Sequence, residues 1–327
     1  MKRRTIIRGA AVIAVAAVVT GGGATAQPAY PDKPVKLIIP YPPGGPTDLL
    51  GRLVAQSLSE SWGQPVVAEN RAGASGTIGS DYVARAKPDG YTLILGNNAS
   101  HGTYELLNPS TTPYITARDF APVALVGIAP QVMVVSTGVG VKDIKSFIAL
   151  AKSRPGQLNY GTSAIGSAPH LAAEMFKLAA GVDLKHIPFN GAAPVMQAII
   201  ANTVQMYIGA PSTVMPQVEA GKAVALGALS SERIPSLPQL PTFKENGVEL
   251  TYNSWFGLLA PAKTPIDILE KINADVNKML ENETIKKQLV DLGFLAEGGD
   301  REYFRKVVDE ETATTKTIIE AAKIEVK

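Results

Sequence analysis

Short apolar segments alternate with longer amphipathic segments along most of the chain. The segment at 35–39 (VKLII) is short, rich in β-branched residues and bounded by prolines, which is typical of a buried strand. The next segment begins at Thr47 or Asp48, either of which can cap a helix, and runs to about Trp62 with its leucines on one face. The pattern therefore predicts a strand followed by an amphipathic helix.

The same alternation continues to the end of the chain. Further strands are predicted at 65–68, 91–96, 132–136, 158–161, 184–188, 204–208 and 224–229, and a strand around Trp255 is expected to return to the first domain. Helices are predicted at 144–153, 168–180, 192–201, 211–220, 266–280, 283–292 and from 301 to about 324. Such alternation predicts parallel sheets with helices on both faces.

About 300 residues of this pattern are more than a single hydrophobic core usually accommodates, so we expect two α/β domains. No Ser/Gly-rich linker and no run of charge marks a single break between them. We therefore expect the chain to cross between the domains more than once.

The first 26 residues are typical of an export signal. A basic start that includes Arg3 and Arg4 precedes an apolar run at 10–19, and the small-x-small pattern at 24–26 predicts cleavage after Ala26. The run is too short to span a membrane. The paired arginines also fit a twin-arginine signal, so secretory and twin-arginine export both stay open.

Removal of that signal changes the charge of the chain. The whole sequence has 31 Lys+Arg and 29 Asp+Glu, and the signal contains four of the bases and no acid, which leaves 27 against 29. A mixed, near-neutral surface argues against a nucleic-acid partner. The sequence has no Cys and three His, so ligands for a metal or for redox chemistry are scarce, and we expect no metal and no cofactor.

Three loops share one design, in which a strand ends, small residues follow and a helix begins. They are 41–48 (YPPGGPTD), 160–167 (YGTSAIGS) and 189–194 (FNGAAP). Glycine lets the backbone approach a ligand, and a helix N-terminus offers free N–H donors and partial positive charge. None of the loops contains a phosphate-loop or GxGxxG pattern, which makes a carboxylate a better ligand than a nucleotide.

An enzyme is the main alternative class. A hydrolase would carry a nucleophile elbow, but no G-x-S-x-G string occurs in the sequence. Ser163 or Ser167 with His170 is a loose nucleophile–base pair, so a hydrolase stays open as the weaker reading and we expect a protein that is not an enzyme.

The chain resembles the Bug/TctC family, the extracytoplasmic solute receptors of tripartite tricarboxylate transporters, over essentially its whole mature length. The segments that carry the resemblance are, in order, YPDKPVKLIIPYPPGGPTDLLGRLVA, VVAENRAGASGTIGSDYVARAKPDGYTLILG, YGTSAIGSAPHLAAEMF, HIPFNGAAPVMQAI, VEAGKAVALGALSSERIPSLPQLPTF and WFGLLAPAKTP.

The resemblance implies a periplasmic-binding-protein (Venus flytrap) fold, with two α/β domains joined by two crossovers and a ligand cleft between them. The implied boundaries are 1–26 for the signal peptide, 27–130 with 254–327 for domain 1, and 131–253 for domain 2. It also implies a periplasmic, monomeric receptor that captures a dicarboxylate, aromatic carboxylate or hydroxy acid by closure and delivers it to membrane permease subunits. A sensing receptor that serves a signalling partner is an alternative.

Carried over by position, the resemblance implies ligand contacts from both domains and no catalytic residue. The domain 1 contacts would be Pro43, Gly44, Gly45, Pro46, Thr47, Asp48, Asn97 and Asn98. The domain 2 contacts would be Thr162, Ser163, Ser167, His170, Asn190, Gly191 and Ala192.

Three positions depart from the usual family pattern and bear on ligand choice. Ala164 stands where glycine is common, Asn190 where a base is common, and Gly209 where an acid is common. Without an acid at Gly209 to pair with an ammonium group, a plain carboxylate is favoured over an amino acid.

Several of these residues have an ordinary structural interpretation as well. His170 and Asp48 are as easily explained by packing or helix capping as by ligand contact. His101 fits the rim of a pocket or, better, an exposed loop, and His186 fits a satisfied strand residue. Trp255 could stack on a ligand ring, but a core position is favoured. Glu174 lies four residues after His170, which favours a local pair.

Overall fold

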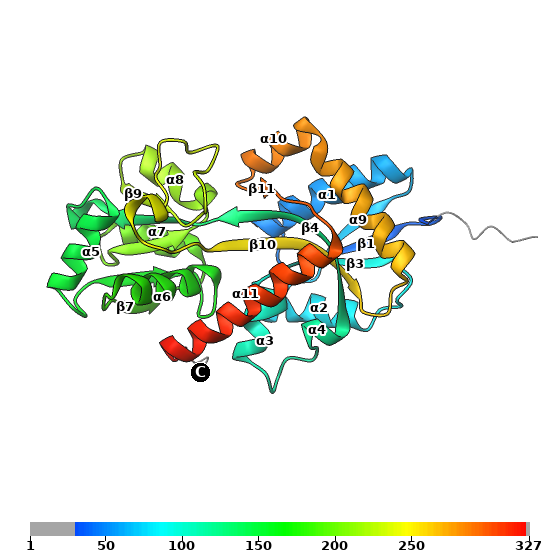
Figure 1. Cartoon of the computed structure of the whole chain (residues 1–327), viewed down its shortest axis with the longest axis horizontal. Coiled ribbons are helices and arrows are strands. Elements are labelled where there is room, and N and C mark those ends of the chain that lie inside the picture. The colour runs from blue at the N-terminus through cyan, green and yellow to red at the C-terminus, as the bar shows by residue number, and fades with distance from the viewer. Residues whose placement is uncertain (1–29, 325–327) are drawn as a thin grey trace, which may run out of the picture.

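The computed structural model describes residues 30–324 and contains two mixed β-sheets, each covered by helices (Figure 1). The first sheet has the order β11-β4-β10-β3-β1-β2 and the second β7-β6-β8-β5-β9. We call the first sheet with its helices the first lobe, and the second sheet with its helices the second lobe. The predicted cleavage at Ala26 lies outside the described residues.

The strands of the first sheet are β1 (Val35–Ile39), β2 (Val66–Asn70), β3 (Thr92–Asn97), β4 (Phe120–Pro130), β10 (Asn253–Pro261) and β11 (Leu295–Ala296). Those of the second sheet are β5 (Val132–Ser136), β6 (Asn159–Thr162), β7 (Lys185–Pro188), β8 (Met206–Gly209) and β9 (Ala223–Ala228). The helices are α1 (Pro46–Trp62), α2 (Thr77–Ala84), α3 (Tyr104–Leu107), α4 (Thr116–Asp119), α5 (Ile144–Ser153), α6 (Ala168–Ala180), α7 (Ala192–Ile200), α8 (Pro211–Glu219), α9 (Ile266–Glu281), α10 (Glu283–Asp291) and α11 (Arg301–Ala322), with a π-helical segment η2 (Ala99–Thr103).

The sheets are mixed, which corrects the prediction of parallel sheets. Strand β1 pairs in parallel with β2 and β3, but β10 pairs antiparallel with both β3 and β4. In the second sheet, β5 runs antiparallel to β8 and β9. The antiparallel strands β5 and β10 are those that directly follow the two crossings between the lobes. Their direction is set by the crossings, and the local alternation of strands and helices does not predict it.

Strand β4 was missed by the sequence analysis, although its 11 residues make it longer than any other strand described here. Pro122 and Gly127 interrupt its apolar run, and both residue types weaken a strand pattern. Gly127 is required by close packing, because a β-carbon at this position would lie 2.6 Å from the carbonyl oxygen of Leu295 on β11.

Two adjacent strands carry the chain between the lobes. Gln131 joins β4 to β5, and Tyr252 leads from the second lobe into β10. Asn253 pairs with Pro130 across the two strands, so the crossings lie side by side, as Figure 1 shows. We call this region the junction.

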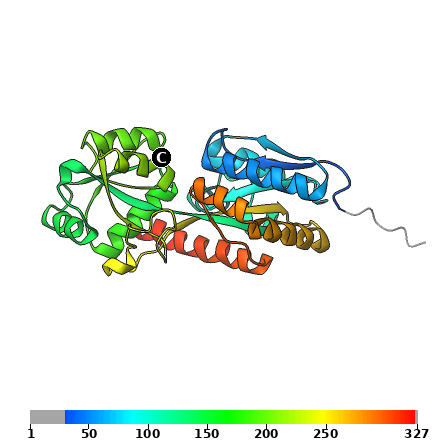
Figure 2. The ribbon, with the colours of Figure 1, turned by 90° about the horizontal axis from the view of Figure 1, so that it is seen from above.

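Helix α11 is a third link between the lobes. Its residues Phe304 and Val308 pack in the core of the first lobe with Trp255, whereas Ile318 packs in the core of the second lobe with Phe176. Figure 2 shows the helix, in red, reaching from one lobe to the other. The end of the chain, which the sequence analysis assigned to domain 1, therefore contacts both lobes.

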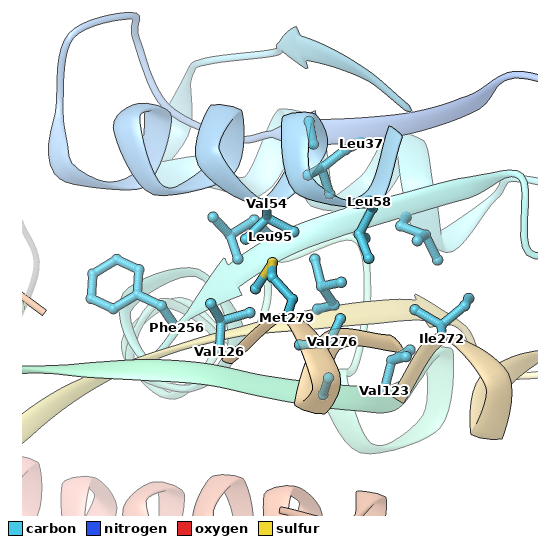
Figure 3. Close-up of a cluster of buried hydrophobic side chains, with 14 of the residues drawn as sticks. Leu37, Val54, Leu58, Leu95, Val123, Val126, Phe256, Ile272, Val276 and Met279 are labelled. Atoms are coloured by element: carbon cyan, nitrogen blue, oxygen red, sulfur yellow. The ribbon is translucent and has the colours of Figure 1, made fainter. Parts of the chain in front are cut away.

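Side chains alternate between the two faces of each sheet, as strand geometry requires. In the first lobe, Leu37 and Leu95 pack in a cluster with residues of α1 and α9 (Figure 3). Ile38 and Ile94 pack in a second cluster on the opposite face of the sheet. In the second lobe, Met133 and other residues of one face meet α5 and α6, while the opposite face meets α7 and α8.

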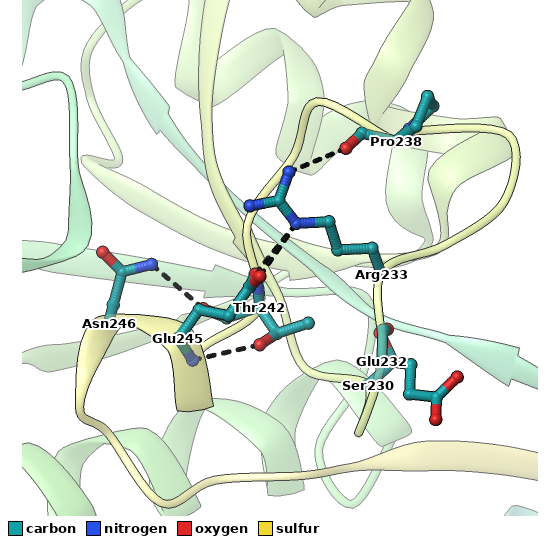
Figure 4. A network of polar contacts seen from close by, with 7 residues as sticks. All are labelled: Ser230, Glu232, Arg233, Pro238, Thr242, Glu245 and Asn246. Carbon is teal, nitrogen blue, oxygen red and sulfur yellow. Dashed lines mark hydrogen bonds and ion pairs between the residues drawn. The ribbon is translucent and has the colours of Figure 1, made fainter.

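A segment without long secondary structure, 229–252, joins β9 to β10 and is held by its own polar contacts (Figure 4). Arg233 forms an ion pair with Glu245 at 2.9 Å and also donates to the carbonyl of Pro238. Thr242 accepts from the Glu245 backbone N–H, and its own N–H donates back to the Glu245 carboxylate. This reciprocal pattern fixes the approach to Tyr252 and the junction.

Candidate functional site

The carboxyl ends of β1, β2 and β3 converge, and Tyr41 joins the three loops that follow them. Its hydroxyl donates to Oδ1 of Asn97 at 2.9 Å and approaches the carbonyl of Ser75 at 3.4 Å. Burial raises the pKa of Tyr41 to about 12, so this hydroxyl keeps its proton and remains a donor. In open α/β sheets such a strand edge is where ligands bind.

The loop 41–48 is held by the carboxylate of Asp48. This carboxylate accepts hydrogen bonds from the Gly44 N–H at 2.9 Å, from Asn70 at 2.8 Å and from Arg52 at 3.1 Å. Burial alone would raise the pKa of Asp48, but these hydrogen bonds lower it. Asp48 is 2% exposed, so its role in the structure is to hold the loop against β2 and α1.

The start of α1 presents backbone donors. Gly45 is the N-cap residue, its backbone is extended, and no side chain caps the helix. Within the described residues, the N–H groups of Gly45, Thr47 and Asp48 have no acceptor. Pro43, Gly44 and Pro46 are exposed beside them, whereas Thr47 and Asp48 are buried. Unpaired donors at a helix N-terminus favour an anion.

A fourth loop of the same design follows β2, and the sequence analysis assigned no contact to it. Its residues Gly73, Ala74, Ser75 and Gly76 have φ values of 135°, 45°, 54° and 95° in succession. Left-handed conformations of Ala74 and Ser75 cost about 1–2 kcal/mol each, and such strain gathers at functional sites. The strand–Gly–x–x–Gly–helix spacing (GASG before α2) was the available sequence signal.

Asn97 and Asn98 both lie at the end of β3 and are buried. Oδ1 of Asn97 accepts from the N–H groups of Ala99 and Ser100, each at 3.1 Å, and so fixes the start of η2. The amide of Asn98 donates to the hydroxyl of Tyr252 at 2.9 Å. The Asn98 amide and the Oδ1 of Asn97 are therefore engaged within the protein and shape the strand end.

The two predicted loops of the second lobe are bonded to each other. The N–H of Gly191 donates to the carbonyl of Ser163 at 2.8 Å, and the N–H of Phe189 donates to the carbonyl of Thr162 at 2.9 Å. The hydroxyl of Thr162 also meets Nε2 of His186 at 2.6 Å. The structure thus brings the loops after β6 and β7 together into one wall.

His170 fixes the first of these loops. Its ring is 4% exposed, and its Nδ1 accepts from the Gly166 N–H at 3.0 Å. The ring stacks on His186 with centroids 4.1 Å apart. Burial, with smaller effects from His186 and Lys177, lowers the pKa of His170 to about 3, so the ring is neutral and acts as an acceptor.

The pair expected between Glu174 and His170 does not form. Glu174 instead accepts from the hydroxyl of Tyr160 and forms an ion pair with Lys177 at 2.8 Å. The i, i+3 spacing to Lys177 supplies a cation, which satisfies the buried carboxylate better than a neutral imidazole can.

The remaining predicted contacts lie at the starts of α6 and α7. Ser167 is the N-cap residue of α6, and its hydroxyl donates to the carbonyl of Ala164 at 2.7 Å. Gly191, with φ of 106°, is the N-cap residue of α7, next to Asn190, which is exposed, and Ala192. Among the described residues, no hydrogen bond joins the hydroxyl of Ser163 or Ser167 to the His170 ring, whose Nδ1 accepts from Gly166, so the loose hydrolase pair is not assembled.

The loop after β6 meets the first lobe. A β-carbon at Gly166, which has φ of 73°, would collide with the side chain of Leu107 and would lie 3.6 Å from Thr103. Thr103 and Leu107 belong to η2 and α3, which directly follow the end of β3. Strand-end loops of both lobes therefore face one another at this contact.

His101 and Trp255 are both core residues. His101 is fully buried beside Phe120, at a centroid distance of 4.6 Å, so its placement on an exposed loop was wrong. The segment 99–103 (ASHGT) has a polar sequence, but it forms η2 and its residues 100–103 are buried, with the His101 ring next to that of Tyr114. Trp255 is 1% exposed, which confirms the core interpretation.

A cavity of about 720 Å³ lies elsewhere, beside α11 and α4. It is lined by apolar residues such as Phe120 and Leu259 and by charged residues such as Glu270 and Arg305. None of the contacts predicted from the sequence lines it. Among residues 30–324, no group of three His, Cys, Asp or Glu side chains is placed to hold a metal ion, and no helix has the length and apolarity to cross a membrane.

Two sheet-bearing lobes, joined by adjacent crossing strands and with helix N-termini at the strand ends, define a two-lobed solute-binding protein. The family model described as "Tripartite tricarboxylate transporter family receptor" (TctC) matches residues 50–324. This chain therefore belongs to the TctC family. A relative, BugT of Bordetella pertussis, is 35% identical over 257 residues, which cover 78% of this chain and 79% of BugT.

Solved structures of similar proteins share this architecture. Rpa4515 of R. palustris, solved with adipate, is 35% identical to this chain, with a TM-score of 0.79. The match covers 90% of this chain and 99% of Rpa4515. MatC of Rhodopseudomonas palustris, solved with bound malate, is 31% identical, with a TM-score of 0.74. The match covers 89% of this chain and 100% of MatC. The predicted Venus flytrap fold is thereby confirmed, and the family and these neighbours are solute-binding receptors.

Proposed function

We propose that this protein captures a small organic carboxylate between its lobes and delivers it to the membrane permease of a tripartite tricarboxylate transporter. The observation that carries the proposal is the set of unpaired N–H groups at the start of α1, at Gly45, Thr47 and Asp48. A carboxylate is the natural partner of such donors. Adipate and malate, bound by two solved relatives, belong to this chemical class.

The charges around the loops favour backbone recognition. Arg52 is engaged by Asp48, and Arg71 forms an ion pair with Glu69 at 2.6 Å. His170 is neutral because burial lowers its pKa to about 3. The ligand carboxylate is therefore held by amides of the first lobe, with the hydroxyl groups of Ser163 and Ser167 contributed by the second.

Closure of the lobes completes the proposed mechanism. Ligand contacts to both lobes favour the arrangement in which the two walls approach, and bending at Gln131 and Tyr252 supplies the movement. The permease recognises the closed, loaded receptor. This role places the protein in the periplasm as a monomer, after removal of its signal peptide.

Calorimetric titration of the purified protein with adipate and with its neutral diamide tests the proposal. The two molecules share a carbon skeleton and differ in charge, so binding of the acid alone supports recognition of an anion by the amide cradle. Malate and an aromatic monocarboxylate extend the series to the other ligand classes. Equal binding of acid and diamide would contradict the carboxylate assignment. Co-purification with permease subunits separates transport from a sensing role.

A further inference from the structure

The middle of α11 lies where this helix passes from the first lobe to the second. Val308 packs in the core of the first lobe, and Ile318 packs in the core of the second. Glu311 lies between these two anchors, one turn before Thr315, which is fully buried. A carboxyl group therefore occupies the crossing point between the lobes.

The carboxyl group of Glu311 is surrounded by neutral side chains. Its Oε1 accepts from the hydroxyl of Thr315 at 2.9 Å and from the amide of Asn98 at 3.4 Å. Its Oε2 is cut off from solvent and has no partner among the described residues, and the same is true of the indole nitrogen of Trp255. Gly102 packs so closely that a β-carbon there would lie 3.3 Å from Oε2. Among the described residues, no basic side chain forms an ion pair with Glu311.

The same carboxyl group is connected to the junction. Asn98, which donates to Glu311, also donates to the hydroxyl of Tyr252 at 2.9 Å. Tyr252 packs in the core of the second lobe and directly precedes β10. Burial raises the pKa of Tyr252, and the nearby Glu311 raises it further, so the two groups sense each other's charge.

The charged residues nearest in sequence, Asp309, Glu310 and Lys316, are exposed. Glu310 forms an ion pair with Lys306 on the exposed side of α11. The groups that face the Glu311 carboxyl are thus neutral: Thr315 on its own helix, Asn98 at the end of β3, Trp255 on β10 and the un-ionised Tyr252.

Burial raises the pKa of Glu311 to about 7, although the hydrogen bonds from Thr315 and Asn98 and the neighbouring indole of Trp255 act to lower it. The carboxyl therefore exchanges its proton near neutral pH. In the buried position, the protonated group is tolerated and the ionised group is costly, because no cation compensates it.

We propose that Glu311 is a proton-dependent latch between the lobes: the protonated carboxyl holds the lobe arrangement described here, and loss of the proton favours an arrangement in which the carboxylate reaches water. The inference rests on the lobe movement of the proposed function. Because a group that titrates differently in two arrangements must bias their equilibrium, pH shifts the populations of the two.

Distances between two spin labels, one in each lobe, test the latch. The chain has no Cys, so Gln56→Cys on α1 and Lys145→Cys on α5, both exposed, give unique attachment sites. Between about pH 5 and about pH 9, the distance distribution is expected to change with a midpoint near 7. Glu311→Gln is expected to keep the low-pH distribution throughout. Glu310→Gln, at an exposed position on the same helix, is the control and keeps the response of the parent protein.

A second variant keeps the test decisive if Glu311→Gln folds poorly. Thr315→Val removes a donor that favours the ionised carboxylate, so the midpoint is expected to move to higher pH. Distances that do not change with pH, or an unchanged midpoint in these variants, would overturn the latch. Addition of adipate to the same labelled protein at low pH tests lobe movement separately. A response to adipate without a response to pH contradicts the latch and leaves the proposed function standing.

Discussion

The side-chain amide of Asn98 donates a hydrogen bond to the hydroxyl of Tyr252 at 2.9 Å, across 154 positions of sequence. Asn98 directly follows β3, the strand that leads into the candidate site, and Tyr252 directly precedes β10, which returns the chain to the first lobe. Both residues are buried, so removal of either partner would leave a buried polar group without a hydrogen bond and would lower stability. The wall of the candidate site and the junction between the lobes are therefore parts of one hydrogen-bonded unit.

Gly45→Val is expected to weaken carboxylate binding by two orders of magnitude or more, a loss of about 3 kcal/mol. A β-carbon at this position meets nothing closer than the carbonyl of Pro42 at 3.8 Å, and φ is −83°, so the fold tolerates the change. The branched side chain covers the amides at the start of α1. Calorimetric titration measures the effect, and Gln56→Val on the same helix is the control. Unchanged affinity in Gly45→Val would contradict the placement of the anion.

Ser167→Ala is expected to weaken binding only about fivefold, which corresponds to about 1 kcal/mol for one neutral hydrogen bond. The hydroxyl proton is already donated to the carbonyl of Ala164, so the hydroxyl can serve a ligand only as an acceptor or by giving up that bond. The same titration measures the change. A complete loss of binding would mean that Ser167 holds the loop as well as the ligand.

Much of the fold could be predicted because uninterrupted apolar runs specify it. The run at 132–136 coincides with β5, and the helices at 144–153 and 168–180 coincide with α5 and α6. Strand β4 could not be predicted from its interrupted run, because its pairing with β10 and β11 is established only in the folded chain. Local periodicity contains no information on such long-range partners.

The candidate site was predictable in its backbone and less so in its side chains. Strand–small residue–helix spacing located the starts of α6 and α7. It placed the start of α1 slightly late, because Gly45 is the N-cap and the expected caps Thr47 and Asp48 lie within the helix. Asp48 accepts hydrogen bonds from Arg52 and Asn70, and Asn98 donates one to Tyr252. The bonds from Asn70 and to Tyr252 join residues that only folding brings together. The ligand contacts assigned to individual side chains therefore stay predictions.

Gly209→Ala is expected to lower the free energy of unfolding by about 1–3 kcal/mol, as overpacked core substitutions do. A β-carbon at Gly209 would lie 2.5 Å from the ring of Tyr207, which is buried in the second lobe. This packing favours glycine at position 209 next to Tyr207. Chemical denaturation measures the effect, and the cost should shrink in a Tyr207→Leu background. An equal cost in both backgrounds would assign the destabilisation to another contact.

Glu311 is expected to make the protein less stable as pH rises. Its pKa is raised from 4.5 to about 7 in the folded protein, so the folded state keeps a proton that the unfolded chain releases. The resulting stabilisation is fully present below about pH 4.5 and is lost as pH rises through about 7, a change of about 3 kcal/mol.

Denaturant unfolding of the parent protein and of Glu311→Gln at a series of pH values measures this contribution. The difference between the two free energies of unfolding should fall with increasing pH, whereas the difference between the parent and Glu310→Gln should change little. A difference that is constant with pH would show that Glu311 has an ordinary pKa in the folded protein.

The most direct test of the central claim is thermal unfolding of the purified, ligand-free protein against a panel of carboxylates. The panel contains citrate, dicarboxylates, aromatic carboxylates, hydroxy acids, aspartate and glutamate. A true ligand at about 100 times its dissociation constant adds about 2.7 kcal/mol of stability, which raises the unfolding midpoint visibly. We predict a clear rise with one class of plain carboxylate and none with aspartate or glutamate. A flat response to the whole panel would contradict the assignment of this protein as a carboxylate receptor.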